Sequence, residues 1–274
     1  MPDPTPDAAV TAASSNTERF YTQVKSLHEF DKIEVRCVID NLLSKTDDEA
    51  CHLATYVRTQ SNIESLLLLN ASKHVQAIAM IARALFELAV DSRLLETIPN
   101  AWIKATAHAE VEKLRLANRI INFKRANPAV TTDTEVYQNY IDQNAVRITA
   151  IQESIWPGVK KVEHWSGMTL AVRCATLKAP FDQMYAEDYP RISWYTHPGL
   201  TGISNVPFVA FIHVCAYAYN LAVKSYEQSL LTVIRVFKLS KGNEHIEDRL
   251  GAAMKCPFAD TDEQKEVLRK QAGL

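Results

Sequence analysis

Apolar residues recur at intervals of three and four through most of this chain, which is the periodicity of amphipathic helices. The first such segment keeps this spacing at Phe20, Val24, Leu27, Ile33, Val38 and Leu42. No segment alternates between apolar and polar positions for long enough to predict a strand. The chain is therefore predicted to be all-α.

Capping residues and prolines divide this pattern into separate helices. Thr46 and Glu49 have the spacing of a capping box, in which each side chain accepts a hydrogen bond from the backbone of the other. Pro99, Pro128 and Pro157 each follow a predicted helix end. Helices are expected at residues 17–43, 46–69, 73–97, 100–126, 133–155, 166–177, 180–195 and 204–238.

These elements predict one helical bundle of about seven to nine helices, mostly antiparallel and joined by short connections. The bundle domain is expected over residues 17–240. Residues 1–16 are rich in proline and small polar side chains, so we expect a disordered lead-in there. Residues 241–274 are expected to form short C-terminal helices. The helix at 73–97 has a wide apolar face, which predicts a central position.

Charge and cysteine content narrow the class of protein. The 30 basic and 32 acidic residues nearly cancel, so no global field favours an anionic partner. The five cysteines are scattered and never form a CxxC pair, which favours a reducing, cytoplasmic location. The N-terminal residues lack the apolar core of a signal peptide. The most apolar run, 206–223, contains His213 and Asn220, so no membrane helix is expected.

Motifs for cofactors are missing from the sequence. Neither GxxxxGK[ST] nor GxGxxG occurs, so we expect no nucleotide cofactor. Glu49 and His52 form one ExxH, but a di-iron bundle needs two. The other histidines have no ligand spacing, so no metal and no other cofactor is expected.

One charge pair lies in an apolar setting on the helix at 73–97. Arg83 and Glu87 are four residues apart, so they share a helix face, and their neighbours are apolar on nearly every side. A buried charge needs a partner, which predicts either an internal ion pair that fixes helix register or a cleft-lining pair. In the second case Arg83 would bind a phosphate or carboxylate and Glu87 would hold its geometry.

The segment 69–95, the later HWSG and the pattern Y-x-x-x-S-x-x-x-H together resemble the DUF5677 family of bacterial helical proteins. The resemblance covers about residues 55–238. It implies an all-α fold and no assigned activity. The residues of this sequence that match the family pattern are Arg83, Glu87, His164, Trp165, Tyr189, Ser193 and His197.

Arg191 and His197 are separated by five residues, a spacing similar to the R-x4-6-H signature of the HEPN superfamily. This resemblance implies a metal-independent endoribonuclease of toxin or phage-defence type. It also implies that the protein forms a homodimer and that RNA is its substrate. His197 would act as general acid or base. Arg191 would stabilise charge on the phosphate, with Arg83 and Glu87 in the same cleft. His164, Trp165, Tyr189 and Ser193 would bind substrate.

Plainer interpretations of the same residues stay open. His197 can cap a helix C-terminus, and Arg191 can be a solvated surface charge. The basic residues of the helix at 100–126 can follow an RNA backbone or form a solvated face. The alternative function is therefore a non-enzymatic helical module that binds a partner or acts as a scaffold. A hydrolase acting on a small phosphorylated or acyl substrate is a third possibility.

Overall fold

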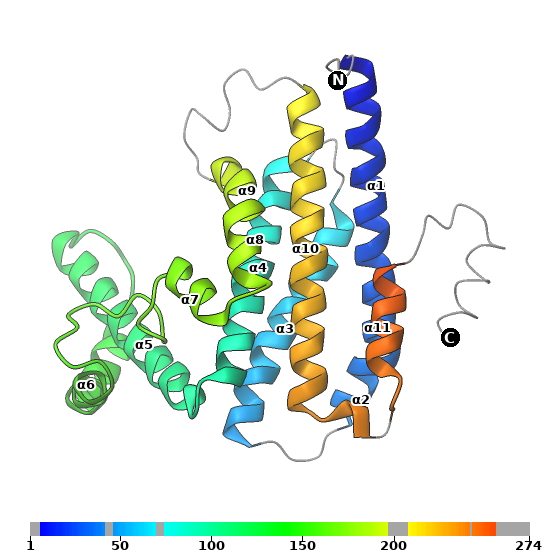
Figure 1. The fold of residues 1–274 in the computed structure, drawn as a ribbon. Coiled ribbons are helices and arrows are strands. Elements are labelled where there is room, and N and C mark those ends of the chain that lie inside the picture. Colours follow the sequence, from blue (N-terminus) through cyan, green and yellow to red (C-terminus); the bar gives the residue numbers. More distant parts are fainter. Residues whose placement is uncertain (1–5, 42–45, 70–73, 197–207, 242, 256–274) are drawn as a thin grey trace. The chain divides into compact units, whose positions relative to one another are not determined.

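The protein is described by a computed structural model, which covers residues 6–41, 46–69, 74–196, 208–241 and 243–255. These residues form helices and no strands, so the all-α prediction is confirmed. Figure 1 shows long helices running side by side.

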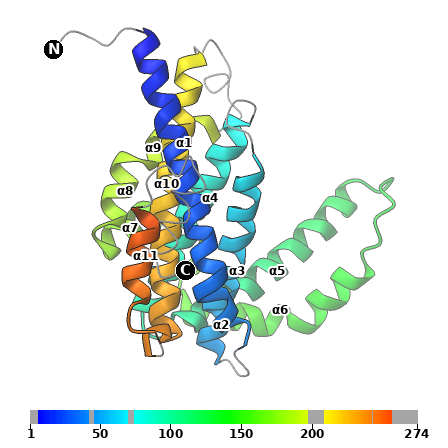
Figure 2. The same ribbon diagram turned by 90° about the vertical axis from the view of Figure 1, so that its right-hand side faces the viewer.

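Four long helices make up the main bundle (Figures 1 and 2). They are α1 (Pro6–Phe30), α3 (Asp47–Leu68), α4 (Val75–Thr97) and α10 (Phe208–Val236). Helix α10 packs most extensively against α4 and α1, and it also contacts α3. The side chains that fill the space between α4 and its neighbours are fully buried, among them Ile78, Leu85 and Phe86. The predicted central position of α4 is confirmed.

Helix α1 continues without a break into a π-helical turn, η1 (Asp31–Arg36), and a last short turn, α2 (Cys37–Ile39). Single π-helical turns within α-helices are frequent at functional sites. Helix α3 begins with the predicted capping box. The amide nitrogen of Glu49 donates to the Thr46 hydroxyl oxygen, and a Glu49 carboxylate oxygen accepts from the Thr46 amide at 2.9 Å.

The remaining helices of the bundle are shorter. Helix α8 (Phe181–Glu187) leads into α9 (Tyr189–Thr196), which packs on α4 and α10. One helix was predicted over 180–195, and Asp188 separates the two observed ones. Near the C-terminal end, η3 (Leu239–Lys241) precedes α11 (Ile246–Met254), which packs on α1.

Helix α1 begins inside the stretch that was expected to be a disordered lead-in. Residues 6–16 are helical, and their alanines favour helix formation. Ala13 is buried, and the Thr17 hydroxyl donates to the Ile212 carbonyl oxygen of α10 at 3.2 Å. Packing against α10 therefore accounts for the earlier start.

The contacts divide the chain into two compact units, where the sequence predicts one bundle domain over 17–240. The first unit comprises residues 1–97 and 173–274, and the second comprises residues 98–172. The second unit contains α5 (Ala101–Ala126) and α6 (Glu135–Ile155), and α7 (Leu170–Leu177) spans the boundary. The expected domain end at residue 240 stays a prediction.

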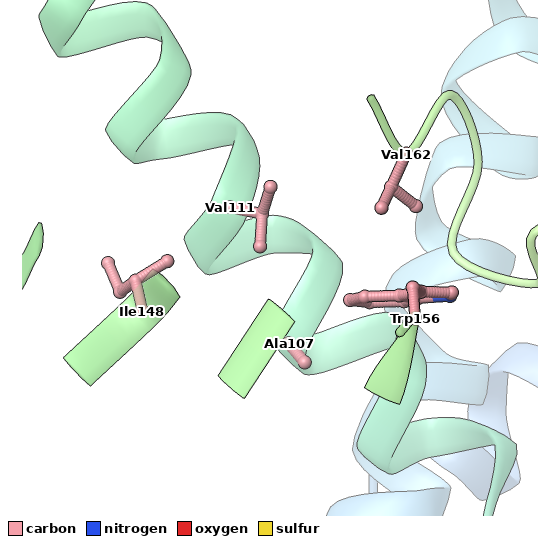
Figure 3. Packing of buried hydrophobic residues seen from close by; sticks show 5 residues of the cluster. All are labelled: Ala107, Val111, Ile148, Trp156 and Val162. Carbon is pink, nitrogen blue, oxygen red and sulfur yellow. The ribbon is translucent and has the colours of Figure 1, made fainter. Parts of the chain in front are cut away.

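A small hydrophobic core holds α5 and α6 together as a hairpin. Figure 3 shows Ala107 and Val111 of α5 close to Ile148 of α6, with Trp156 and Val162 of the following segment beside them. Among the helices of the described chain, none has both the length and the apolarity needed to span a bilayer.

Candidate functional site

Four polar residues from α4 and α9 form one hydrogen-bonded group, which we call the α4–α9 cluster: Arg83, Glu87, Tyr189 and Thr196. The Arg83 Nε atom donates to Glu87 Oε1 at 2.9 Å, and Arg83 Nη1 donates to the Thr196 hydroxyl oxygen at 3.3 Å. The Tyr189 hydroxyl donates to the same Glu87 oxygen at 3.2 Å. The side chains of Arg83 and Glu87 are 33% and 37% exposed, so the group is open to solvent.

The local sequence explains why these groups meet. Arg83 and Glu87 are neighbours on one face of α4 because they are four residues apart. Tyr189 is the first residue of α9 and Thr196 is its last, so both ends of that short helix are attached to α4. The hydrogen bond from Arg83 to Glu87 raises the pKa of Arg83, so its charge is retained at every physiological pH.

Tyr189 connects the cluster to an aromatic surface. Its ring stacks on Tyr185 with centroids 5.4 Å apart, and it packs at 5.4 Å from the ring of Phe86. The Arg83 guanidinium carbon lies 5.4 Å from the Tyr189 ring centroid, within cation–π range. Partial burial and the nearby Glu87 carboxylate raise the pKa of Tyr189 to about 12, so it stays a hydrogen-bond donor.

Arg191 lies on α9 but contacts a different neighbour. Its guanidinium carbon lies 4.7 Å from the ring centroid of Tyr217 on α10, and the side chain is exposed. Ser193 takes part through its carbonyl oxygen, which accepts a 2.7 Å hydrogen bond from the Thr196 hydroxyl. His197 follows Thr196 in the sequence and lies outside the described residues. Its predicted role, and its place in a cleft with the other residues, stay predictions.

A partly buried ion pair beside the cluster joins the start of α9 to α10. Asp188 is 4% exposed and immediately precedes Tyr189. Its carboxylate accepts from Lys224 Nζ at 2.7 Å and from Asn220 Nδ2 at 3.4 Å. Sequence reasoning missed Asp188, although it is the residue at which the predicted helix 180–195 divides.

The predicted substrate-binding residues His164 and Trp165 belong to the second unit, where they form a tight turn. The Gly167 amide donates to the His164 carbonyl oxygen at 2.9 Å, and Gly167 has a positive φ of 72°, which favours glycine. His164 Nδ1 is 2.8 Å from the Ser166 hydroxyl and accepts from the Ser166 amide at 3.2 Å. Trp165 is buried, as expected for a packing residue.

The indole of Trp156 holds this turn in place. Its Nε1 atom donates to the Trp165 carbonyl oxygen at 3.2 Å, and its ring lies 3.6 Å from the position that a Cβ on Gly167 would occupy. The His164 ring also lies 6.5 Å from the His108 ring. Within this unit, therefore, the HWSG motif forms a structural turn. The hypothesis that His164 and His197 share a pocket stays a prediction.

A second polar group lies in the bundle core, and no sequence pattern predicted it. Asp31 is fully buried in η1, and its two carboxylate oxygens accept from the hydroxyls of Tyr56 at 2.6 Å and Tyr226 at 2.7 Å. Gln60 donates to the Tyr226 hydroxyl at 3.3 Å. We call these four residues the Asp31 cluster. Burial raises the pKa of Asp31 to about 6, and the tyrosine hydrogen bonds oppose that rise.

Metal chemistry has no ready site in the part of the chain that the structure describes, because no three His, Cys, Asp or Glu side chains come together there. Comparisons with family models, with curated proteins and with solved structures find no match for this chain. The resemblances to the DUF5677 family and the HEPN superfamily therefore stay predictions.

Proposed function

We propose that this protein binds RNA at the α4–α9 cluster and cleaves it without a metal ion. The observation that carries the proposal is the placement of Arg83. Its guanidinium is held by Glu87 on one side and bonds on the other to Thr196, the residue directly before His197. Arg83 thus bonds to the residue that precedes the predicted acid–base residue in the sequence.

The chemistry assigns one role to each residue. Arg83 binds a non-bridging phosphate oxygen and stabilises the charge that develops there, which is the usual work of a fixed guanidinium. Glu87 holds Arg83 in place and does not contact the substrate. In the cleavage step the 2′-hydroxyl oxygen attacks phosphorus and the bond to the 5′-oxygen breaks. His197 either takes the proton of the 2′-hydroxyl or gives one to the leaving 5′-oxygen, and water exchanges the other proton.

The surroundings of the cluster support a single-stranded substrate. Tyr185 and Tyr189 present aromatic rings beside Arg83, and Tyr217 lies under Arg191. Aromatic rings alternating with guanidinium groups bind unpaired bases and the phosphates between them. Because Tyr189 and Arg191 are two residues apart on one helix, they face different sides of α9. We therefore assign Arg191 to a second phosphate of the same strand.

Cleavage of a labelled single-stranded RNA in the presence of EDTA tests the proposal. The wild-type protein is expected to cut, and His197→Ala is expected to lower the rate by about 10²–10⁴-fold, the usual contribution of a general acid or base. Arg83→Ala is expected to lower the rate as well. Arg58→Ala is the matched control, because Arg58 is an exposed arginine on α3. If the wild-type protein leaves every RNA intact, the proposal is wrong.

One observation favours the alternative of a non-enzymatic helical module. The four residues of the α4–α9 cluster bond to one another. In this alternative their role is to hold α9 on α4, without a substrate. In that case the wild-type protein would not cleave RNA, and Arg83→Ala would lower the melting temperature. Thermal unfolding measured on the same protein samples separates the two functions.

A further inference from the structure

Half of the basic side chains of α5 already have partners within the protein. The helix has six basic and two acidic residues. Lys113 is paired with Glu110, Arg115 is paired with Glu112, and Lys124 donates to backbone carbonyl oxygens of the segment that follows the helix. These three cations are therefore engaged in local contacts.

The other three cations of α5 are exposed and unpaired. They are Lys104, Arg119 and Arg125, and no ion pair or hydrogen bond within the described ranges involves their side chains. At 100° per residue, Lys104 and Arg119 lie within about 60° of each other around the helix axis, whereas Arg125 lies on the side that faces α6. Lys104 and Arg119 therefore share one edge of α5, about 22 Å apart along the helix.

The segment after α6 brings a further unpaired cation to the same edge. Arg115 Nη2 donates to the Val162 carbonyl oxygen at 3.1 Å, so this segment contacts α5 between Lys104 and Arg119. Figure 3 shows Val162 beside α5. Lys160 is two residues before Val162, is exposed, and has no ion-pair or hydrogen-bond partner in the part of the chain that the structure describes. We call Lys104, Arg119 and Lys160 the α5 edge.

An exposed aromatic ring lies next to one of these cations. Phe123 is 58% exposed and is four residues from Arg119, so the two side chains are neighbours on the helix surface. A guanidinium beside an aromatic ring is the combination that binds a phosphate and stacks on the adjoining base of an unpaired strand.

The acids of α6 lie on a different side of the hairpin. Glu135 and Asp142 are exposed on the side of α6 that faces away from the buried Ile148 and the hairpin core. Glu153 accepts a hydrogen bond from the Gly158 amide at 3.1 Å. The hairpin is thus polarised, with unpaired cations along α5 and acids along the outer side of α6.

We propose that the α5 edge is a second binding site for single-stranded RNA, made of other residues than the α4–α9 cluster. Its cations bind phosphates, and Phe123 stacks on a base beside Arg119. The choice of RNA as the polyanion rests on the proposed function. The α5 edge takes no part in the cleavage step, so its role is to hold the strand and raise the affinity for RNA.

Binding of a labelled RNA of about 12 nucleotides tests this site on the full-length chain. All proteins carry His197→Ala so that the RNA stays intact, and the dissociation constant is measured in EDTA at several salt concentrations. Replacement of Lys104, Arg119 and Lys160 by alanine is expected to raise the dissociation constant at least about tenfold. The salt slope is expected to fall by about two, because each of three lost phosphate contacts contributes about 0.7.

The matched control removes three cations of the same unit that already have acidic partners. Lys113 and Arg147 pair with Glu110, and Lys161 pairs with Glu163, so their triple alanine variant has the same net charge as the test variant. Its dissociation constant and salt slope are expected to change much less. Equal changes in the two variants would mean that net charge alone governs binding, and would overturn the proposal.

Single substitutions test the stacking contact. Phe123→Ala is expected to raise the dissociation constant by at least about fivefold and to leave the salt slope unchanged, since the ring carries no charge. Leu116→Ala, which removes a similarly exposed apolar side chain that cannot stack, is expected to have no effect. Circular dichroism checks that each variant keeps its helix content.

Cleavage assays with His197 in place separate the two proposals. If the protein cuts RNA but its affinity does not depend on the α5 edge, the second site is wrong and the proposed function stands. If RNA binds through the α5 edge and is never cut, the second site stands and the proposed function is wrong. A protein that binds no RNA overturns both.

Discussion

Two carboxylates in this protein accept hydrogen bonds from tyrosines, and their surroundings differ in almost every other respect. Glu87 is 37% exposed, and Arg83 donates to it at 2.9 Å, so its charge has both water and a cation nearby. Asp31 is fully buried, and its hydrogen-bond partners are two tyrosine hydroxyls. A carboxylate in the first setting keeps a guanidinium in position, whereas one in the second connects helices at a cost in desolvation.

Disruption of the two clusters should therefore have different effects. The Asp31 cluster joins η1, α3 and α10, so its disruption should lower the stability of the whole bundle. The α4–α9 cluster is at the edge of α4 and faces solvent, so its disruption should change ligand binding more than stability.

Removal of the Asp31 carboxylate is expected to have the largest effect on stability. Asp31→Ala leaves the hydroxyls of Tyr56 and Tyr226 buried without their acceptor. Each such group costs roughly 1–3 kcal/mol, so the free energy of unfolding should fall by about 3 kcal/mol. Unfolding in urea, monitored by circular dichroism, measures this free energy. Asp40→Ala, at an exposed position near the end of the same helix, should change the value by less than about 0.5 kcal/mol. Equal losses in both variants would contradict the role of the Asp31 cluster.

The pH dependence of stability should carry the signature of Asp31. Its pKa is about 6 in the folded protein and near 3.8 for an ordinary carboxyl, so the folded state binds the proton more tightly. The stability that protonated Asp31 contributes is complete below pH 3.8 and is lost as the pH rises to about 6. This difference corresponds to roughly 3 kcal/mol.

Two buried histidines change the free energy of unfolding in the opposite direction, over a neighbouring pH range. Burial lowers the pKa of His28 and of His52, so their contribution is lost as the pH falls below about 6.5. A comparison of wild type with Asp31→Asn separates the two effects, because the histidines are common to both proteins. The difference in unfolding free energy should fall between pH 4 and pH 6 and stay constant above that. A difference that is constant across the range would contradict the raised pKa of Asp31.

Neutralisation of Glu87 is expected to have a small effect on stability. Glu87→Gln keeps the shape and removes the charge of a partly exposed ion pair, which is worth less than about 1 kcal/mol. The melting temperature should fall by no more than about 2–4 °C. Glu64→Gln is the matched control, since Glu64 forms an ion pair of similar exposure with Arg36. A fall much larger than that of the control would place the α4–α9 cluster among the structural elements.

Periodicity predicted the long helices well, because a repeat of apolar positions is a local property of the sequence. The helices that became α3, α4, α5 and α6 began and ended within a few residues of the predicted positions. The spacing of Thr46 and Glu49 also predicted the two reciprocal hydrogen bonds of the capping box. Helix α1 started earlier than predicted because Ala13 and Thr17 pack on α10, a contact between distant parts of the sequence.

The contacts of the polar groups were harder to predict, because they too join distant parts of the sequence. The pairing of Arg83 and Glu87 could be anticipated, since four residues separate them on one helix. Their contacts with Tyr189 and Thr196 depend on how α9 packs, which no local pattern reveals. The sequence did contain one sign of Asp31, because it is four residues from both Leu27 and Val35 and so shares their apolar helix face. Its tyrosine partners on α3 and α10 could not be identified without the fold.

The most direct test of the account is the affinity of the α4–α9 cluster for RNA. Fluorescence anisotropy with a labelled single-stranded oligonucleotide in EDTA, at several salt concentrations, measures the dissociation constant and its salt dependence. Arg83→Ala is predicted to raise the dissociation constant by roughly tenfold and to reduce the salt slope by about one, as expected when one phosphate contact is lost. Arg58→Ala should leave both unchanged. If Arg83→Ala, still folded, binds RNA with the same affinity and salt slope as the wild type, the central claim is wrong.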